Sequence, residues 1–303
     1  MNYSYIEGVL NTAPPPLLFH YTSPAGFIGM VLTKKIWATH VRYLNDHQEL
    51  VHAVQLAKDV VMRTQESLAG ISAKDDRQQL LCDMVTYLGA ASSDVYVASL
   101  TEQRDQLSQW RAYCPPGGGY ALGVSSDQLR VVCKEQGFYV APCVYERDRQ
   151  TRMVKEIFDT HYQSALRAFE QTPATERPEH FVRDLAVTFC RELAKFGAVL
   201  KHHSFAEERE WRLIAPSPGV NSPRIMHRAG PHSIIPYLEF NLITSNFPDL
   251  LRKGTEGQLT AVAGPTRDRD ATSFAMQSLL QKGFPGVLGG FWMGQSESPY
   301  RGT

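Results

Sequence analysis

The chain has 303 residues, of which 31 are Lys or Arg and 31 are Asp or Glu, so its formal net charge is zero. A chain of this length buries roughly three quarters of the surface that it exposes when unfolded, so its core needs no disulfide or metal. Zero net charge argues against a histone-like or polybasic nucleic-acid-binding protein, because such binding depends on many phosphate contacts. A local basic groove is still compatible with this charge.

The five cysteines are widely spaced, and none belongs to a CxxC pair or a Cys/His ligand run. This pattern fits a reducing compartment best. Near the N-terminus no basic segment precedes an apolar stretch, and nowhere do about twenty apolar residues run together. The sequence therefore predicts a cytoplasmic protein with no membrane-spanning helix and no obvious export signal.

The first expected elements follow three prolines at 14–16, which hold the chain extended. Residues 17–21 have the composition of a strand. The Ser-Pro pair at 23–24 is typical of a helix start, with an N-cap followed by proline at the first helical position. A short strand is expected at 36–39, and the Asn-Asp pair at 45–46 can cap a long helix after it.

The middle of the chain alternates helix and strand signals. Apolar spacing predicts a helix around 80–88, and residues 95–100 form a clear strand pattern. Three glycines at 117–119 separate an aromatic-rich segment from a strand at 120–124, and a further strand is expected over 138–145.

The pattern turns helical from 148 to 195, with breaks at Pro173 and Pro178, and we interpret residues 148–200 as a helical insertion. Grouped strands with helices between the groups favour an α+β fold, here one domain over residues 1–303. The remaining expected elements are strands at 210–214, 233–237, 259–263 and 287–288 and a helix at 270–281.

A first polar cluster lies at the end of the first expected strand, Phe19 to Ser23. Alternation along a strand puts His20 and Thr22 on one face and Tyr21 on the other. The functional interpretation is an imidazole that donates to a ligand hydroxyl at a sheet edge. The structural alternative is an ordinary buried histidine followed by a helix cap.

A second cluster, Leu107 to Tyr113, gathers Ser108, Trp110, Arg111 and Tyr113 beside the glycines. Such a mixture is costly in a core, because each polar group needs a partner, and it suits a binding surface. The alternative is a Trp-anchored turn in which Arg111 pairs with a carboxylate.

A third cluster is FAEEREWRLI at 205–214. If the strand begins near Glu208, then Glu208, Glu210 and Arg212 share a face. Two neighbouring carboxylates raise the pKa of one of them, and such a pair suits binding of a sugar hydroxyl or of a developing cation. The alternative is a solvated strand edge on which Glu210 pairs with Arg212.

Other patterns point away from metal and nucleophile chemistry. The adjacent His202 and His203 cannot both reach one ion, and His47 and His52 are five residues apart, so zinc is not expected. No GxSxG, P-loop or kinase motif is present. A basic run at 147–155 could steer an anionic acceptor, although a solvated helical face explains it equally simply.

The order of these motifs resembles a widespread family of bacterial proteins of unknown function, and the resemblance spans nearly the whole chain. Its series is HYTS at 20–23, WAT followed by YLND at 37–46, SQWR at 108–111, a Glu-x-Glu-aromatic-Arg strand at 208–212, a GP turn at 264–265 and PYR at 299–301.

The clusters also resemble, more distantly, the ADP-ribosyltransferase superfamily, whose split β-sheet binds NAD in a cleft. The resemblance implies that His20 forms a hydrogen bond with the nicotinamide ribose and that Tyr21 and Thr22 also contact the cofactor. Glu210, supported by Glu208, would stabilise the oxocarbenium-like state. Ser108, Trp110 or Tyr113 would hold the nicotinamide, and Arg42 or Arg111 would meet the pyrophosphate.

The expected function is that of an NAD-dependent mono-ADP-ribosyltransferase, a toxin or phage-defence effector that modifies nucleic acid or protein and has a possible antitoxin partner. NAD is its substrate, and no metal is required. One alternative is a non-enzymatic nucleic-acid- or ligand-binding module on the same fold, and others are an NAD glycohydrolase or a nuclease. The transferase hypothesis predicts that His20, residues 108–113 and the two glutamates converge on one cleft.

Overall fold

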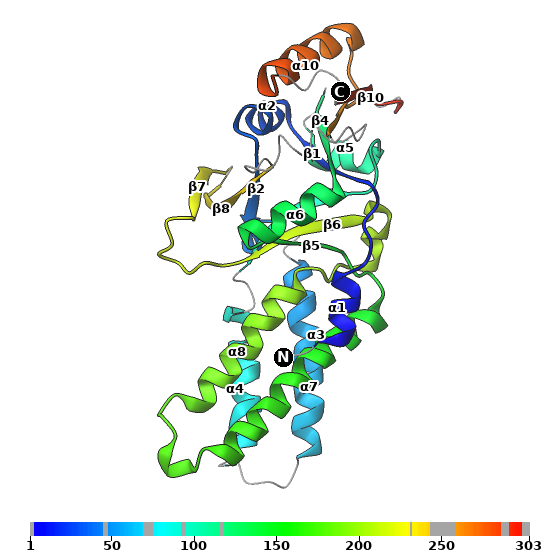
Figure 1. Cartoon of the computed structure of the whole chain (residues 1–303). Helices are drawn as coiled ribbons and strands as arrows, with labels where there is room; N and C mark the ends of the chain where they lie inside the picture. The colour runs from blue at the N-terminus through cyan, green and yellow to red at the C-terminus, as the bar shows by residue number, and fades with distance from the viewer. Residues whose placement is uncertain are drawn as a thin grey trace.

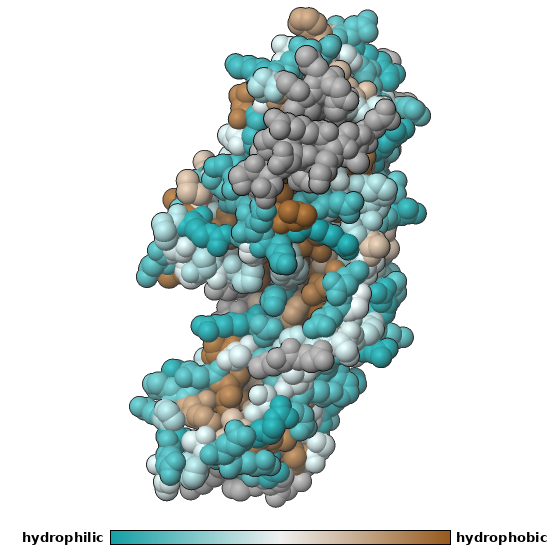
Figure 2. Space-filling model, viewed as in Figure 1, coloured by the Kyte–Doolittle hydropathy of each residue, from teal (hydrophilic) through white to brown (hydrophobic). Residues whose placement is uncertain are grey.

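The structure is a computed structural model that describes residues 3–44, 48–68, 75–91, 95–114, 118–230, 232–242, 259–285 and 291–298. It is a mixed α/β protein with an open, mixed sheet. In Figure 1 the sheet occupies the middle of the molecule, a group of long helices extends from one end, and α2 and α10 lie near the other. Figure 2 shows hydrophilic side chains over most of this face, with apolar ones gathered in smaller areas.

The described helices are α1 (Ser4–Leu10), α2 (Pro24–Thr33), α3 (Gln48–Ser67), α4 (Asp76–Ala91), α5 (Leu107–Tyr113), α6 (Ser126–Gln136), α7 (Arg147–Gln171), α8 (Phe181–Gly197) and α10 (Arg269–Gly283), with 3₁₀ turns η1 (Val41–Tyr43), η2 (Ala174–Glu176) and η3 (His203–Glu208). The strands are β1 (Leu17–Thr22), β2 (Lys35–His40), β3 (Val95–Thr101), β4 (Tyr120–Ser125), β5 (Tyr139–Pro142), β6 (Glu210–Pro216), β7 (Met226–Ala229), β8 (Ile234–Asn241), β9 (Leu259–Ala263) and β10 (Phe291–Gln295).

The sheet runs in the order β10-β9-β4-β1-β3-β2-β8-β7, and β6 pairs with both β3 and β5. Strands β9 and β10 are parallel, and the other described pairs are antiparallel. Strand β1 pairs with β4 along its whole length, but it meets β3 at one register pair, Phe19 with Thr101. The sheet therefore consists of two strand sets that diverge beyond this pair.

Apolar side chains form two large cores. One core lies among α3, α4, α7 and α8 and includes Val97 and Ile214 from the sheet. The other lies between the sheet and α2, α6 and α10. The sheet thus contributes to both cores.

Helix α2 begins as its sequence predicts. Ser23 caps it by accepting a hydrogen bond from the Gly26 backbone N–H at 3.1 Å, and Pro24 occupies the first turn. The helix ends at Lys34, whose φ of 62° is left-handed. This turn reverses the chain into β2, so α2 and β2 lie beside each other.

Most of the expected elements are confirmed, with small changes in their bounds. Residues 147–197 form α7 and α8, with the expected interruption near Pro173 and Pro178, and these helices pack with α3 and α4 to one side of the sheet (Figure 1). The division of the chain into a domain and an insertion stays a prediction.

The strand expected over 138–145 is limited to 139–142. Four of the described helices and strands were not predicted: α1, which precedes the prolines and buries Ile6 and Val9, α5, α6 and β7. The last described strand is at 291–295, whereas residues 287–288 and the expected cap at 45–46 lie outside the described residues.

None of the described helices combines the length and apolarity needed to cross a membrane. All five cysteines are described, and each is a free thiol. A cytoplasmic location stays a prediction.

Candidate functional site

A cavity of about 910 Å³ lies where the two strand sets diverge. His20 and Thr22 of β1 form one wall, immediately beyond the pair that joins β1 to β3. Ser99 of β3 lies opposite, and further lining residues come from α2, β2, η1, η3, β6, β7 and the end of α5. The volume is within the range that small-molecule sites occupy, about 300 to 1,000 Å³.

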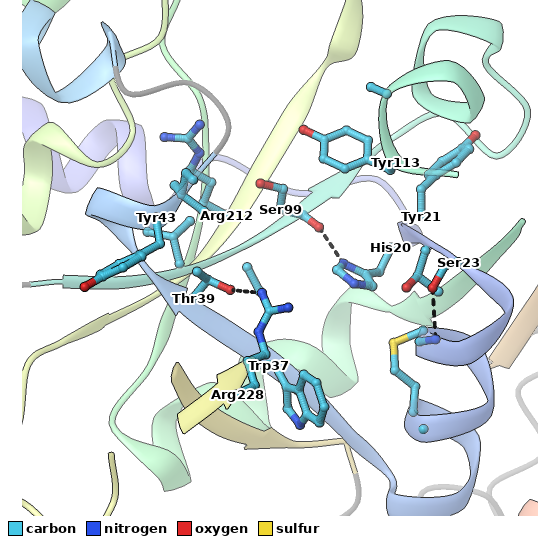
Figure 3. A pocket seen from close by; sticks show the side chains of 18 of the residues that line it. His20, Tyr21, Ser23, Trp37, Thr39, Tyr43, Ser99, Tyr113, Arg212 and Arg228 are labelled. Carbon is cyan, nitrogen blue, oxygen red and sulfur yellow. Dashed lines mark hydrogen bonds between the residues drawn. The ribbon is translucent and has the colours of Figure 1, made fainter. Parts of the chain in front are cut away.

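His20 faces Ser99 across the divergence of the sheet (Figure 3). Its Nδ1 lies 2.8 Å from the Ser99 carbonyl oxygen, which can only accept, so Nδ1 carries the proton. Burial lowers the pKa of the imidazole and outweighs the opposite effect of this hydrogen bond, which favours the neutral ring. In this tautomer Nε2 carries no proton and can only accept a hydrogen bond. A ligand hydroxyl would therefore donate to His20, whereas the sequence analysis expected His20 to donate to the hydroxyl.

The first turn of α2 closes the cavity beside Thr22. A Cβ added to Gly26 would lie 2.1 Å from Thr22 Oγ1, so glycine is needed for the close approach of the helix to β1. Tyr21 is also among the lining residues, but its hydroxyl donates to the Gln103 carbonyl at 2.8 Å and its ring contacts Trp110.

The predicted residues of α5 separate into two groups. Tyr113 reaches the cavity, and Trp110 does not, because its ring is 1% exposed and its Nε1 donates to Asp105 at 2.7 Å. Trp110 therefore anchors the segment, as the structural alternative expected, although the segment is a helix and not a turn. Ser108 Oγ is buried without a hydrogen-bond partner, and Arg111 is exposed outside the cavity lining.

Tyr113 lies close to the glutamates although it comes from a different element. Burial raises the pKa of its phenol, and the negative charge of Glu210 raises it further. The phenol therefore remains neutral at physiological pH and is available as a hydrogen-bond donor.

A buried cluster of four charges forms the wall opposite β1. Lys201 Nζ lies 2.8 Å from Glu208 Oε2 and 2.5 Å from Glu210 Oε2, and Arg212 Nε lies 2.8 Å from Glu210 Oε1. The side chain of Glu208 is 14% exposed and that of Glu210 is 3% exposed. Glu208 lines the cavity and Glu210 does not, so the order of the two glutamates expected from the sequence is reversed: the supporting residue, Glu208, is the one that a ligand can reach.

The sequence analysis expected one carboxylate of this pair to have a raised pKa, and the structure shows the opposite for Glu210. Burial raises the pKa of Glu210, but the charges and hydrogen bonds of Arg212 and Lys201 outweigh burial and lower the pKa to about 2. The expected solvated edge is also wrong, since β6 lies between β3 and β5, although the pair of Glu210 with Arg212 is present.

Glu208 reaches the cavity through a turn. Arg209 has a left-handed φ of 43°, and β6 begins only at Glu210, so Glu208 does not belong to the strand as expected. Its backbone carbonyl accepts from Thr101 Oγ1 at 2.7 Å. The two carboxylates nevertheless meet at Lys201.

Several cavity residues were missed from the sequence. Alternation along β2 puts Lys35, Trp37 and Thr39 on the cavity side, a pattern visible in KIWATH, while nothing in the sequence marks Arg228 or Lys201. The predicted Arg42 is exposed and outside the lining.

The basic run at the start of α7 has partners of its own. Arg149 pairs with Glu146, Lys155 pairs with Asp159, and Arg152 lies over the ring of Tyr5. These contacts favour the solvated-face interpretation of the run.

Residues 109–213 match the family described as Protein of unknown function (DUF2971). The match runs from α5 to β6, so it contains Tyr113 and the charge cluster. This agrees with the resemblance to a family of unknown function. Comparison with curated proteins and with solved structures gave no match.

Proposed function

We propose that the cavity binds NAD and that the protein transfers its ADP-ribose group to an acceptor. The observation that carries the proposal is that His20 of β1 and Glu208, in the turn before β6, line one cavity together with Tyr113. The divergence of β1 from β3 also supports it, because it opens a cavity of the size that small-molecule ligands occupy.

In this proposal His20 positions the nicotinamide ribose. Its Nδ1–H is held by the Ser99 carbonyl, so Nε2 accepts a hydrogen bond from a ribose hydroxyl. Tyr113, a neutral phenol at the same wall, donates to the nicotinamide amide.

Glu208 supplies the negative charge. The bond between ribose C1′ and the nicotinamide nitrogen breaks, and nicotinamide leaves with the bonding electron pair. Positive charge then develops on C1′ and the ring oxygen, and a carboxylate nearby stabilises it. The acceptor donates an electron pair to C1′ and loses its proton to solvent. Glu210 is a positioning residue, since it holds Lys201 and thereby Glu208.

The test is incubation of the purified chain with NAD labelled in its adenylate half and a cell lysate, which is then separated into protein, RNA and DNA. We expect label in one fraction, which would also identify the acceptor class. The matched variants are Glu208→Gln and Glu207→Gln, because Glu207 is exposed and does not line the cavity. Only Glu208→Gln should reduce labelling, by about 10²- to 10³-fold.

Two other results would change the proposal. Release of nicotinamide without label in any fraction would indicate an NAD glycohydrolase, with water as the acceptor. Intact NAD in every fraction would favour the binding-module alternative. A toxin or defence role predicts growth arrest on expression of the wild type and none with Glu208→Gln.

A further inference from the structure

One cavity cation differs from the others in its partners. Lys35, Lys201, Arg212 and Arg228 all line the cavity, and each of the first three forms an ion pair with a glutamate. Within the described part of the chain, no carboxylate pairs with Arg228. Of these four cations, Arg228 is therefore the one whose charge is most available to an anionic ligand.

Arg228 projects from the edge strand β7 toward Thr39 (Figure 3). Its Nη2 donates to Thr39 Oγ1 at 3.2 Å, and its Nε is buried without a partner. One hydrogen bond leaves most of the five guanidinium N–H donors without a described protein acceptor. A half-buried guanidinium with so few partners is stabilised by an anion, and phosphate matches its planar donors.

An exposed aromatic side chain lies beside this cation. The guanidinium carbon of Arg228 is 5.7 Å from the ring centroid of Trp37, whose ring also contacts Tyr237. Trp37 is nevertheless 44% exposed and lines the cavity. A planar base can therefore stack on it next to a phosphate at Arg228.

We infer that Arg228, Thr39 and Trp37 form a nucleotide subsite. Its phosphate accepts from the Arg228 guanidinium and the Thr39 hydroxyl, and its base lies against Trp37. The inference rests on the proposed function, because the subsite belongs to the same cavity. It concerns nucleotide binding alone, in which no covalent bond is broken. The nucleotide is either the adenylate half of NAD or a nucleotide of a nucleic-acid acceptor.

The experiment is isothermal titration of the full chain with ADP and, separately, with a short single-stranded oligonucleotide. Arg228→Gln should weaken binding by about 10- to 100-fold, as expected for loss of charge-assisted hydrogen bonds. Arg224→Gln is the matched control, because Arg224 is exposed, precedes the same strand and lies outside the cavity lining. Trp37→Leu tests the base contact in a second variant, and circular dichroism verifies that each variant is folded.

Each outcome decides the question. Weaker binding of ADP alone assigns the subsite to the adenylate half of NAD, and weaker binding of the oligonucleotide alone assigns it to the acceptor. If the wild type binds neither, or if Arg228→Gln binds both as Arg224→Gln does, the subsite is wrong. Binding of ADP that depends on Arg228 while NAD stays intact would reject only the transferase proposal.

Discussion

Glu208 and Glu210 are two positions apart and share Lys201, but they have different surroundings. The left-handed turn at Arg209 brings Glu208 to the cavity, whereas Glu210 begins the strand and is sealed between two cations. Their chemistry should therefore differ. One carboxylate is accessible to a ligand, and the other holds the first in place.

Substitution of these glutamates should separate turnover from stability. Glu208→Gln removes the charge at the cavity and should reduce NAD turnover by about 10²- to 10³-fold, or roughly 3 to 4 kcal/mol in activation free energy. Glu210→Gln removes the buried negative charge that pairs with Arg212 and Lys201 and should reduce the free energy of unfolding by about 3 to 5 kcal/mol. Denaturant titration and nicotinamide release measure the two effects, and equal stability of both variants would contradict the assignment.

Glu210 should also make the stability depend on pH. Its pKa is about 2 in the folded chain and near 4.5 when unperturbed, so the unfolded state binds more protons between these values. The stabilisation is then fully present above the unfolded pKa and is lost as pH falls toward 2. Urea titrations at pH 7 and pH 3 should show a smaller difference between wild type and Glu210→Gln at the lower pH. A constant difference would mean that Glu210 has an ordinary pKa.

At the scale of elements, the close approach of α2 to β1 determines one wall of the cavity. Gly26→Ala places a methyl group 2.1 Å from Thr22 Oγ1, so either the Thr22 side chain or the first turn of α2 must shift. We expect weaker ligand binding and a lower Tm, both partly restored by adding Thr22→Ala. The control is Gly8→Ala in α1, where a Cβ meets nothing within 4 Å. That change should raise stability by about 0.5 to 1 kcal/mol. A Tm that is unchanged in Gly26→Ala would refute the packing argument.

Local patterns predicted the elements better than they predicted the site. Caps, prolines and alternation located α2, β2 and the interruption near Pro173, because those signals act within a few residues. No element was predicted for the segment 107–113, and in the structure it is a helix whose Trp110 packs on Tyr21 of β1. His20 and Glu208 line one cavity, whereas Glu210, the first of the two expected glutamates, is outside its lining. Arg228 reaches the cavity through pairing of distant strands, which no local pattern encodes.

For the whole molecule, the sheet joins the helical end to the cavity. Val97 and Ile214 belong to the same core as the long helices, so the two parts should unfold together. The four tryptophans belong to β2, α5, β6 and β10, so their fluorescence reports the sheet, while far-ultraviolet circular dichroism reports mainly the helices. We expect the two signals to give one coincident urea transition. Separated midpoints would show that the helical end is an independent folding unit.

The single register pair between β1 and β3 has a thermodynamic consequence for any ligand of the cavity. Phe19 and Thr101 form the register pair between two strand sets that each have extensive pairing of their own, and the hydrogen bond from His20 to Ser99 lies beside it. A ligand that contacts both walls adds cross-links that the backbone lacks. Because the ligand binds only when the two strand sets are together, it raises the free energy needed to separate them. Saturating ligand should therefore slow amide hydrogen exchange along β1 more than along β4.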